Sequence, residues 1–152
     1  MFKQNFLIVC LVISPFYAWA LGSINTSYPN TELKASEIVS LQLMAMQQND
    51  ILNHGIEITY RFASPQNKVQ TGPLSRFIKI VRSPPYSPLL NHLDVTFLNL
   101  KVEGNVAIQE VIITTSIGTR KGFRLLLFLQ QGEKYKECWM TDAVIPFEIM
   151  EV

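Results

Sequence analysis

The stretch VRSPPYSPLLNHLDVTFLNLKV (81–102) changes the hydrophobic rhythm of the chain from helical to extended. Before it, apolar residues recur at intervals of three and four, which is typical of amphipathic helices. After Pro88, the apolar residues Leu93, Val95 and Phe97 alternate with polar ones, which indicates a strand. Helices followed by strands favour an α+β fold over an alternating α/β fold.

Three helices are predicted before this change, at residues 36–49, 56–63 and 73–83. Ser36 is the expected cap of the first helix, whose two apolar faces predict that it is largely enclosed. Pro65 ends the second helix, because the residue before a proline avoids the helical conformation. Residues 66–71 are then expected to form a polar loop before Pro73 begins the third helix.

Four antiparallel strands are predicted after Pro88, at residues 93–102, 106–116, 123–130 and 135–145. Within the first strand the alternation slips at Leu98, which predicts a bulge and a bent sheet. The third strand, FRLLLFLQ, is apolar on both faces and needs cover on both. We therefore expect helices on one face and a second copy of the chain on the other, forming a homodimer through the sheet face.

The N-terminal residues predict export. A single Lys3 precedes an apolar run at 6–16, and small residues at positions 18 and 20 suit a cleavage site, so residues 1–20 are predicted to form a signal peptide. The run is shorter than the roughly 20 residues that a membrane span needs. We expect a periplasmic or secreted protein with no membrane association after cleavage. It would have a flexible lead-in at 21–34 and one domain at 35–147.

Charge and cysteine content narrow the possible partners. Without Lys3, the basic residues fall from 13 to 12 and balance the 12 acidic residues, with histidine neutral. A neutral chain has no general electrostatic reason to bind nucleic acid. Only Cys138 would remain after cleavage, so burial rather than a disulfide must hold the fold. His54 and His92 lie far apart without metal-ligand spacing, so no metal and no cofactor are predicted.

Asp142 is the candidate catalytic residue. By strand alternation it shares a face with Met140 and Val144, which would place its carboxylate in an apolar space as a general base. A structural role, with the carboxylate bonded to backbone N–H groups or to an arginine, is the alternative. His92 and Tyr86 are the candidate acid–base partners, although a capping or surface role is the alternative for the histidine.

Four stretches of the chain together resemble one family. They are QLMAMQQND (42–50), FASPQN (62–67), TGPLSRFIKIVRSPPYSPLLNH (71–92) and CWMTDAV (138–144), and they are similar to the domain-of-unknown-function family 4864. The resemblance covers about residues 35–147 and extends to the SnoaL-like superfamily of the nuclear transport factor two type. It implies a cone-shaped, cystatin-like α+β fold. Because this superfamily contains isomerases, dehydratases, small-molecule binders and interaction domains, the resemblance does not select a function.

A ligand cavity inside such a cone is our leading prediction. We expect it to be lined by Tyr60, Phe77, Arg82, Tyr86, Trp139 and Asp142, with the proline segment at 82–90 as a rigid corner beside its mouth. The alternative is that the aromatic residues only fill the core. The favoured function is non-catalytic binding of a small apolar or amphipathic molecule. A cone-fold isomerase or lyase with Asp142 as base, and an oligomeric interaction module, are the alternatives.

Overall fold

A computed structural model describes residues 24–150 of the chain. In chain order, its elements are α2 (Ala35–Gln47), α3 (His54–Arg61), α4 (Pro65–Thr71), α5 (Leu74–Arg82), the 3₁₀ helix η1 (Ser87–Leu89), β1 (Asp94–Glu103), β2 (Val106–Thr114), β3 (Arg120–Leu129), the 3₁₀ helix η2 (Glu133–Tyr135) and β4 (Trp139–Phe147). The predicted signal peptide at residues 1–20 lies outside the described residues.

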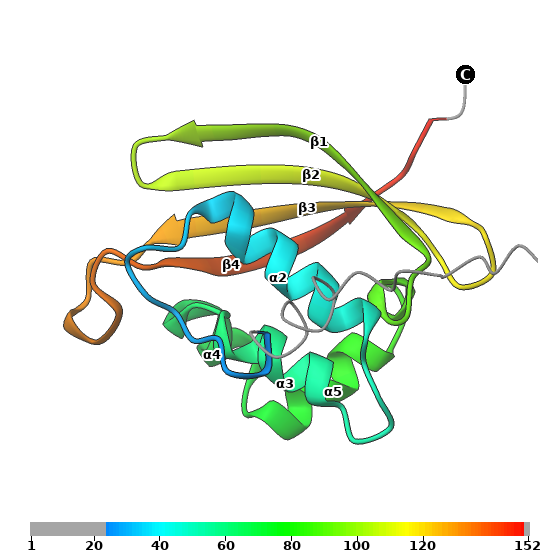
Figure 1. The fold of residues 1–152 in the computed structure, drawn as a ribbon, viewed down its shortest axis with the longest axis horizontal. Helices are drawn as coiled ribbons and strands as arrows, with labels where there is room; N and C mark the ends of the chain where they lie inside the picture. Colours follow the sequence, from blue (N-terminus) through cyan, green and yellow to red (C-terminus); the bar gives the residue numbers. More distant parts are fainter. Residues whose placement is uncertain (1–23, 151–152) are drawn as a thin grey trace, which may run out of the picture.

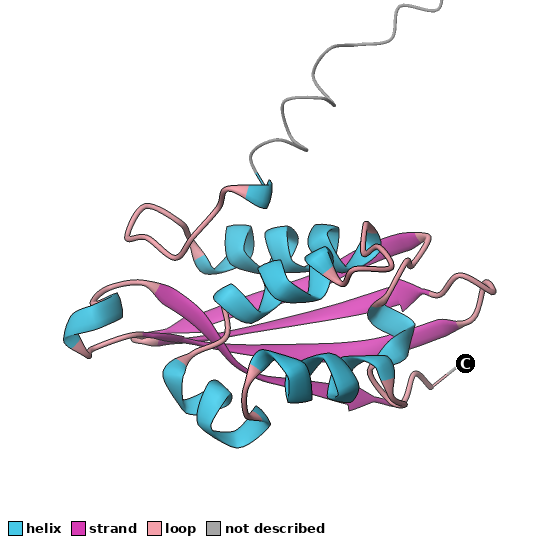
Figure 2. Cartoon of the chain, turned by 90° about the horizontal axis from the view of Figure 1, so that it is seen from below, coloured by secondary structure: helices cyan, strands magenta, loops and turns pink. Residues whose placement is uncertain are grey.

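Within residues 24–150, four α-helices and η1 precede the four strands, which confirms the predicted α+β class. The strands form an antiparallel meander in the order β1-β2-β3-β4. Figure 1 shows the curved sheet on one side of the molecule and all the labelled helices on the other, with α2 nearest to the sheet. Figure 2, seen from the helical side, shows the sheet lying behind the helices. The molecule therefore has one sheet layer and one helical layer, with the core between them.

The core lies between α2 and the middle strands. Along β2 every second side chain is buried, including Val111 and Ile113, because alternate residues of a strand face the same side. Ile38 and Val39 of α2 belong to the same cluster and have no exposed surface. The predicted enclosure of α2 is therefore confirmed.

A bulge interrupts β1 at the predicted place. The pairing of β1 with β2 shifts register between Phe97 and Leu100. Inside this gap the carbonyl oxygen of Leu98 accepts a hydrogen bond of 2.7 Å from the side-chain amide of Gln109. The slip in alternation is thus a real bulge, and such an extra residue bends a strand and increases its twist. The residues left between the first two predicted strands form a turn, with Gly104 at a φ of 57°.

Helix α4 contradicts the prediction that residues 66–71 form a loop. Ser64 caps α4, since its hydroxyl oxygen accepts a 3.0 Å hydrogen bond from the N–H of Asn67. Pro65 occupies the first position of the helix, where its missing N–H costs nothing. The prediction was wrong because it took the Ser-Pro pair as the end of α3 only, although the same pair also begins the next helix.

Other boundaries also differ from the prediction, among them the end of α2 at 47 rather than 49 and the bounds of α3, which spans 54–61 rather than 56–63. Helix α2 begins at Ala35, with the N–H of Lys34 donating to Glu37 at 2.8 Å, so Ser36 lies inside the helix and is not its cap. Strand β3 begins at residue 120 rather than 123. Strand β4 begins at residue 139 rather than 135, because η2 and the left-handed Glu137 (φ 63°) come first.

Residues 24–34 lie against the helical layer. The side chain of Ile24 is buried in the core, and Arg61 of α3 donates a 2.7 Å hydrogen bond to the carbonyl oxygen of Asn25. The guanidinium of Arg61 also lies 4.8 Å from the centre of the Tyr28 ring, within cation–π distance. These contacts attach the segment to the domain.

Candidate ligand-binding site

A cavity of about 170 Å³ lies between β4 and the helical layer, beside the proline corner. It is lined by Met46, Thr59, Asn67, Gln70, Thr71, Phe77, Ile80, Val81, Tyr86, Leu89, Asp142, Ala143 and Val144. An almost wholly apolar hollow of about 50 Å³ adjoins it, since the two share six lining residues, among them Phe77 and Val144. An apolar cavity of about 150 Å³ is enough to hold benzene. The space therefore suits a small organic molecule.

Asp142 reaches this cavity because β4 is bulged there. Leu126 of β3 pairs with Ala143 and Leu127 pairs with Thr141, which leaves Asp142 without a partner residue in the ladder. A bulge of this kind redirects a side chain from the plain alternation of a strand. The half-buried carboxylate therefore joins the lining of the cavity.

The link between α3 and α4 holds the carboxylate of Asp142 in place. This link pairs with β4, because Ser64 N donates to Thr141 O and Thr141 N donates to Phe62 O, both at 2.8 Å. The pairing brings the Ser64 hydroxyl to Asp142, to which it donates a hydrogen bond of 2.7 Å. Ser64 has no exposed surface, and its hydroxyl oxygen also accepts the cap hydrogen bond of α4. Burial and this hydrogen bond together fix the position of its side chain. Nothing in the sequence near Asp142 indicated this partner.

Buried polar side chains line the adjoining hollow, and two of them, Thr59 and Asn67, also line the cavity. Thr141 donates to the side-chain oxygen of Gln42 at 2.6 Å, and the Gln42 amide donates to Thr59 O at 3.1 Å. The amide of Asn67 donates to Thr141 O at 3.1 Å. Among the described residues, every fully buried side-chain nitrogen and oxygen has a hydrogen-bond partner. The network is therefore satisfied internally, and it stiffens the wall rather than offering free donors.

Three of the predicted site residues line this one cavity: Phe77 from α5, Tyr86 from the proline corner, and Asp142 from β4. Tyr60 lies behind the wall, with its ring centre 5.1 Å from that of Phe77 and its hydroxyl donating to Gly72 O at 3.1 Å. Tyr60 therefore supports the aromatic wall from outside the cavity lining.

Arg82 and Trp139 point elsewhere. The exposed Arg82 donates a 2.7 Å hydrogen bond from its Nε to the side-chain oxygen of Asn53, in the link between α2 and α3. Trp139 lines a separate hollow of about 260 Å³ beside Ala35 and Val102. The structure therefore does not place these two predicted ligand-binding residues in the cavity that Asp142 lines.

His92 is buried away from the lining of this cavity, just before β1. Its ring Nδ1 lies 2.8 Å from the carbonyl oxygen of Leu89, so it is positioned as a backbone-bonded side chain. Burial lowers the pKa of His92, although its hydrogen bond to Leu89 and the charge of Asp94 partly oppose this effect. Cys138 is also buried, and burial raises the pKa of its thiol, which disfavours the nucleophilic thiolate.

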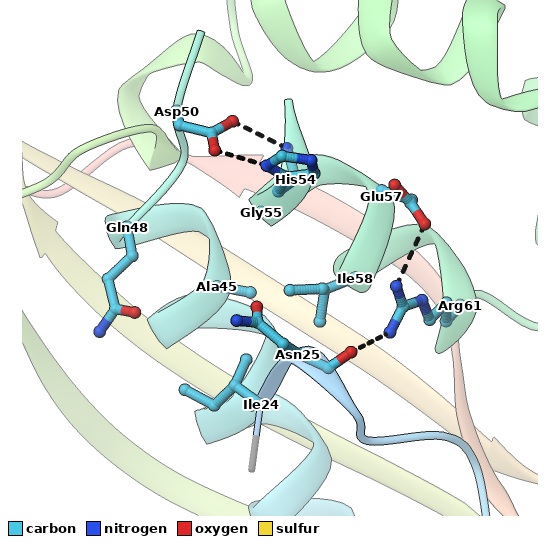
Figure 3. A pocket seen from close by; sticks show the side chains of 10 residues that line it. All are labelled: Ile24, Asn25, Ala45, Gln48, Asp50, His54, Gly55, Glu57, Ile58 and Arg61. Carbon is cyan, nitrogen blue, oxygen red and sulfur yellow. Dashed lines mark hydrogen bonds and ion pairs between the residues drawn. The ribbon is translucent and has the colours of Figure 1, made fainter. Parts of the chain in front are cut away.

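Figure 3 shows a second pocket, of about 360 Å³, between α3, the end of α2 and residues 24–25. Several of its polar side chains are bonded to one another. His54 Nδ1 lies 2.5 Å from Asp50 Oδ2, and the backbone N–H of His54 helps to lower the pKa of that carboxyl group. Arg61 donates to Glu57 at 3.1 Å as well as to Asn25 O. Asp50, Glu57 and Arg61 therefore each already have a hydrogen-bond partner within the protein.

Two further observations apply to residues 24–150. Within this range no three histidine, cysteine, aspartate or glutamate side chains gather closely enough to hold a metal ion. None of the helices in the same range is both long and apolar enough to cross a membrane.

The fold and the cavity define a class: an α+β domain in which helices and a bent antiparallel sheet enclose a small, mostly apolar cavity. Residues 29–148 match the family described as a domain of unknown function (DUF4864), and the chain belongs to that family. No curated protein and no solved structure matches the chain.

Proposed function

We propose that the chain binds a small apolar or amphipathic molecule in the cavity beside Asp142. The observation behind this proposal is that residues from α5, the proline corner and β4 line the same cavity. This cavity continues into the smaller hollow toward the core. Most of the lining is apolar and a few polar side chains join it from α3, α4 and β4, which is the usual make-up of a small-molecule site. The fold also supports membership of the cone-shaped SnoaL-like superfamily.

Tyr86 and Arg82 provide a matched test of this proposal. Both lie at the proline corner, but only Tyr86 lines the cavity. Screening a set of small aromatic and alicyclic compounds by thermal shift should identify binders, and titration calorimetry should measure them. Tyr86→Ala should then weaken binding by roughly tenfold through lost aromatic contact, whereas Arg82→Ala should not. If no compound binds the folded wild-type protein, or if the two variants behave alike, the proposal is wrong.

The alternative is an isomerase or lyase with Asp142 as the general base. Tyr86 supports it, because this residue lines the same cavity and carries an ionisable hydroxyl. His92, the other predicted partner, does not line the cavity. A base of this kind exchanges a substrate proton with solvent, so NMR of a bound compound in deuterated water is the test. Exchange in the wild type that is lost in Asp142→Asn would support catalysis; no exchange in either protein would exclude it for that compound.

The site of action is also a proposal. The apolar N-terminal run, with small residues at positions 18 and 20, supports export to the periplasm or outside the cell. Expression of the full chain followed by cell fractionation and N-terminal sequencing would test it. A chain recovered uncleaved from the cytoplasm would contradict it.

A further inference from the structure

The charge in the lining of the cavity is of one sign only. Asp142 is its single acidic residue, and no lysine, arginine or histidine is present among the lining residues. Arg82, the nearest cation expected from the sequence, is engaged by Asn53 instead. An anionic ligand would therefore meet a carboxylate without any compensating positive charge, which is unfavourable in a partly desolvated space.

The two threonine hydroxyls in the lining already have acceptors within the protein. The hydroxyl of Thr59 donates to Gly55 O at 2.9 Å, and the hydroxyl of Thr71 donates to Asn67 O at 2.9 Å. These donors are therefore already used inside the protein. Asp142 is different: within residues 24–150 its one hydrogen-bond donor is Ser64, which bonds Oδ1 and leaves Oδ2 able to accept from a ligand. The lining thus offers a charged acceptor at Asp142, and Tyr86 and Gln70 add neutral hydroxyl and amide groups.

We propose that the cavity selects small amphipathic amines, with the ammonium group at Asp142 and the apolar body toward Phe77 and Val144. This inference rests on the proposed binding function and adds the chemical class of the ligand. An ammonium supplies the positive charge that the lining lacks, and a charge-assisted hydrogen bond to a carboxylate is stronger than a neutral one. The apolar body then fills a volume close to that of one aromatic ring.

Three probes of one shape and different charge test the selectivity: phenethylamine, phenethyl alcohol and hydrocinnamate. Each has a phenyl ring on a two-carbon chain, and the head group is cationic, neutral or anionic. Calorimetry on the full protein at neutral pH should show phenethylamine binding roughly tenfold more tightly than the alcohol, with the anion weakest. Because this comparison uses only the wild type, it does not depend on the folding of any variant.

Asp142→Asn assigns the preference to the carboxylate. Asparagine keeps a side-chain oxygen that can accept from Ser64, so the wall is retained while the charge is removed. This variant should bind the amine roughly tenfold more weakly and the alcohol almost unchanged. Asp94→Asn is the matched control, since Asp94 is exposed at the start of β1 and does not line the cavity. It should leave all three affinities as they are.

The outcomes separate the two proposals. If the amine and the alcohol bind equally, or if Asp142→Asn leaves the preference intact, amine selectivity is wrong although the cavity still binds apolar molecules. If hydrocinnamate binds best, the inference is likewise overturned. If none of the probes binds and the wider thermal-shift screen is also empty, the binding function itself fails.

Discussion

At the scale of single residues, Gly55 sets how closely α2 and α3 approach. A Cβ atom placed on Gly55 would lie 2.0 Å from the backbone oxygen of Ala45, which no side-chain rotation can relieve. We expect Gly55→Ala to lower the free energy of unfolding by about 2 kcal/mol or more, because the helices must move apart. Chemical denaturation monitored by circular dichroism measures this change.

Gly132→Ala is the control for this substitution. Nothing lies within 4 Å of a Cβ at Gly132, and its φ of −70° is open to any residue. The free energy of unfolding should change by no more than about 0.5 kcal/mol. A similar loss in both variants would show that close packing at Gly55 is not the cause.

The site residues also show what sequence reasoning can find at this scale. Asp142 was identified because it is a lone charge among apolar strand residues, and Tyr86 because prolines surround it. Ser64 was not identified as part of the site, since it meets Asp142 across 78 positions of the chain. That contact exists only because the α3–α4 link pairs with β4, and no local pattern encodes such a pairing. Arg82 was predicted to line the cavity, but its long side chain can contact several partners. In the structure it donates a hydrogen bond to Asn53 instead.

At the scale of elements, two serines test how helices begin. Ser64 caps α4 and donates to Asp142, whereas Ser36, the cap expected from the sequence, lies inside α2. Ser64→Ala should therefore lower the free energy of unfolding by about 1–2 kcal/mol, through the loss of the cap and of a buried hydrogen bond. Ser36→Ala should change it by less than about 0.5 kcal/mol, because alanine is a good residue in a helix interior. Equal losses in urea denaturation would contradict this assignment.

The strands were easier to predict than the helices. All four strands were predicted, β1 and its bulge from the alternation of apolar residues and β3 as a short run that is apolar on both faces. Helix α4 has no comparable pattern: its one buried residue is Asn67, a polar side chain held by Thr141 O. A short helix that packs through a hydrogen bond leaves no apolar stripe in its sequence, so periodicity could not reveal it.

At the scale of the whole molecule, His92 links folding to pH. Its pKa in the folded protein is lowered by burial, so below about pH 6.5 the unfolded chain takes up a proton that the folded protein still excludes. The contribution of His92 to the free energy of unfolding is therefore full above about pH 6.5 and decreases as the pH falls below it. Urea denaturation between about pH 7 and pH 5 should show a smaller decline in His92→Gln than in the wild type. Identical slopes would show that His92 does not titrate differently on folding.

The outer face of the sheet bears on the oligomeric state. None of the described helices covers this face, and it presents half-buried apolar side chains of β2 and β3, such as Ile108, Leu126 and Phe128. On the same face, Glu110 of β2 and Arg124 of β3 form a cross-strand ion pair, with 2.6 Å between the carboxylate oxygen and the guanidinium nitrogen. A twofold axis that passes beside this pair and lies perpendicular to the Glu110–Arg124 direction would set each acid against the arginine of the other copy, with the apolar side chains facing one another. The homodimer through the sheet face stays our prediction on these grounds.

Leu126→Glu tests this dimer, because it places a charge in the centre of the outer face, where a dimer would bury it unpaired. Size-exclusion chromatography with light scattering, at concentrations on the order of tens of micromolar, should show a wild-type dimer and a monomeric variant. Val69→Glu is the matched control, since Val69 is an exposed apolar residue of α4 on the helical side, and this variant should remain a dimer. Circular dichroism must show that both variants are folded. A wild-type monomer at these concentrations would remove the reason to treat the apolar outer face as an interface, and β3 would then be a strand that tolerates exposure.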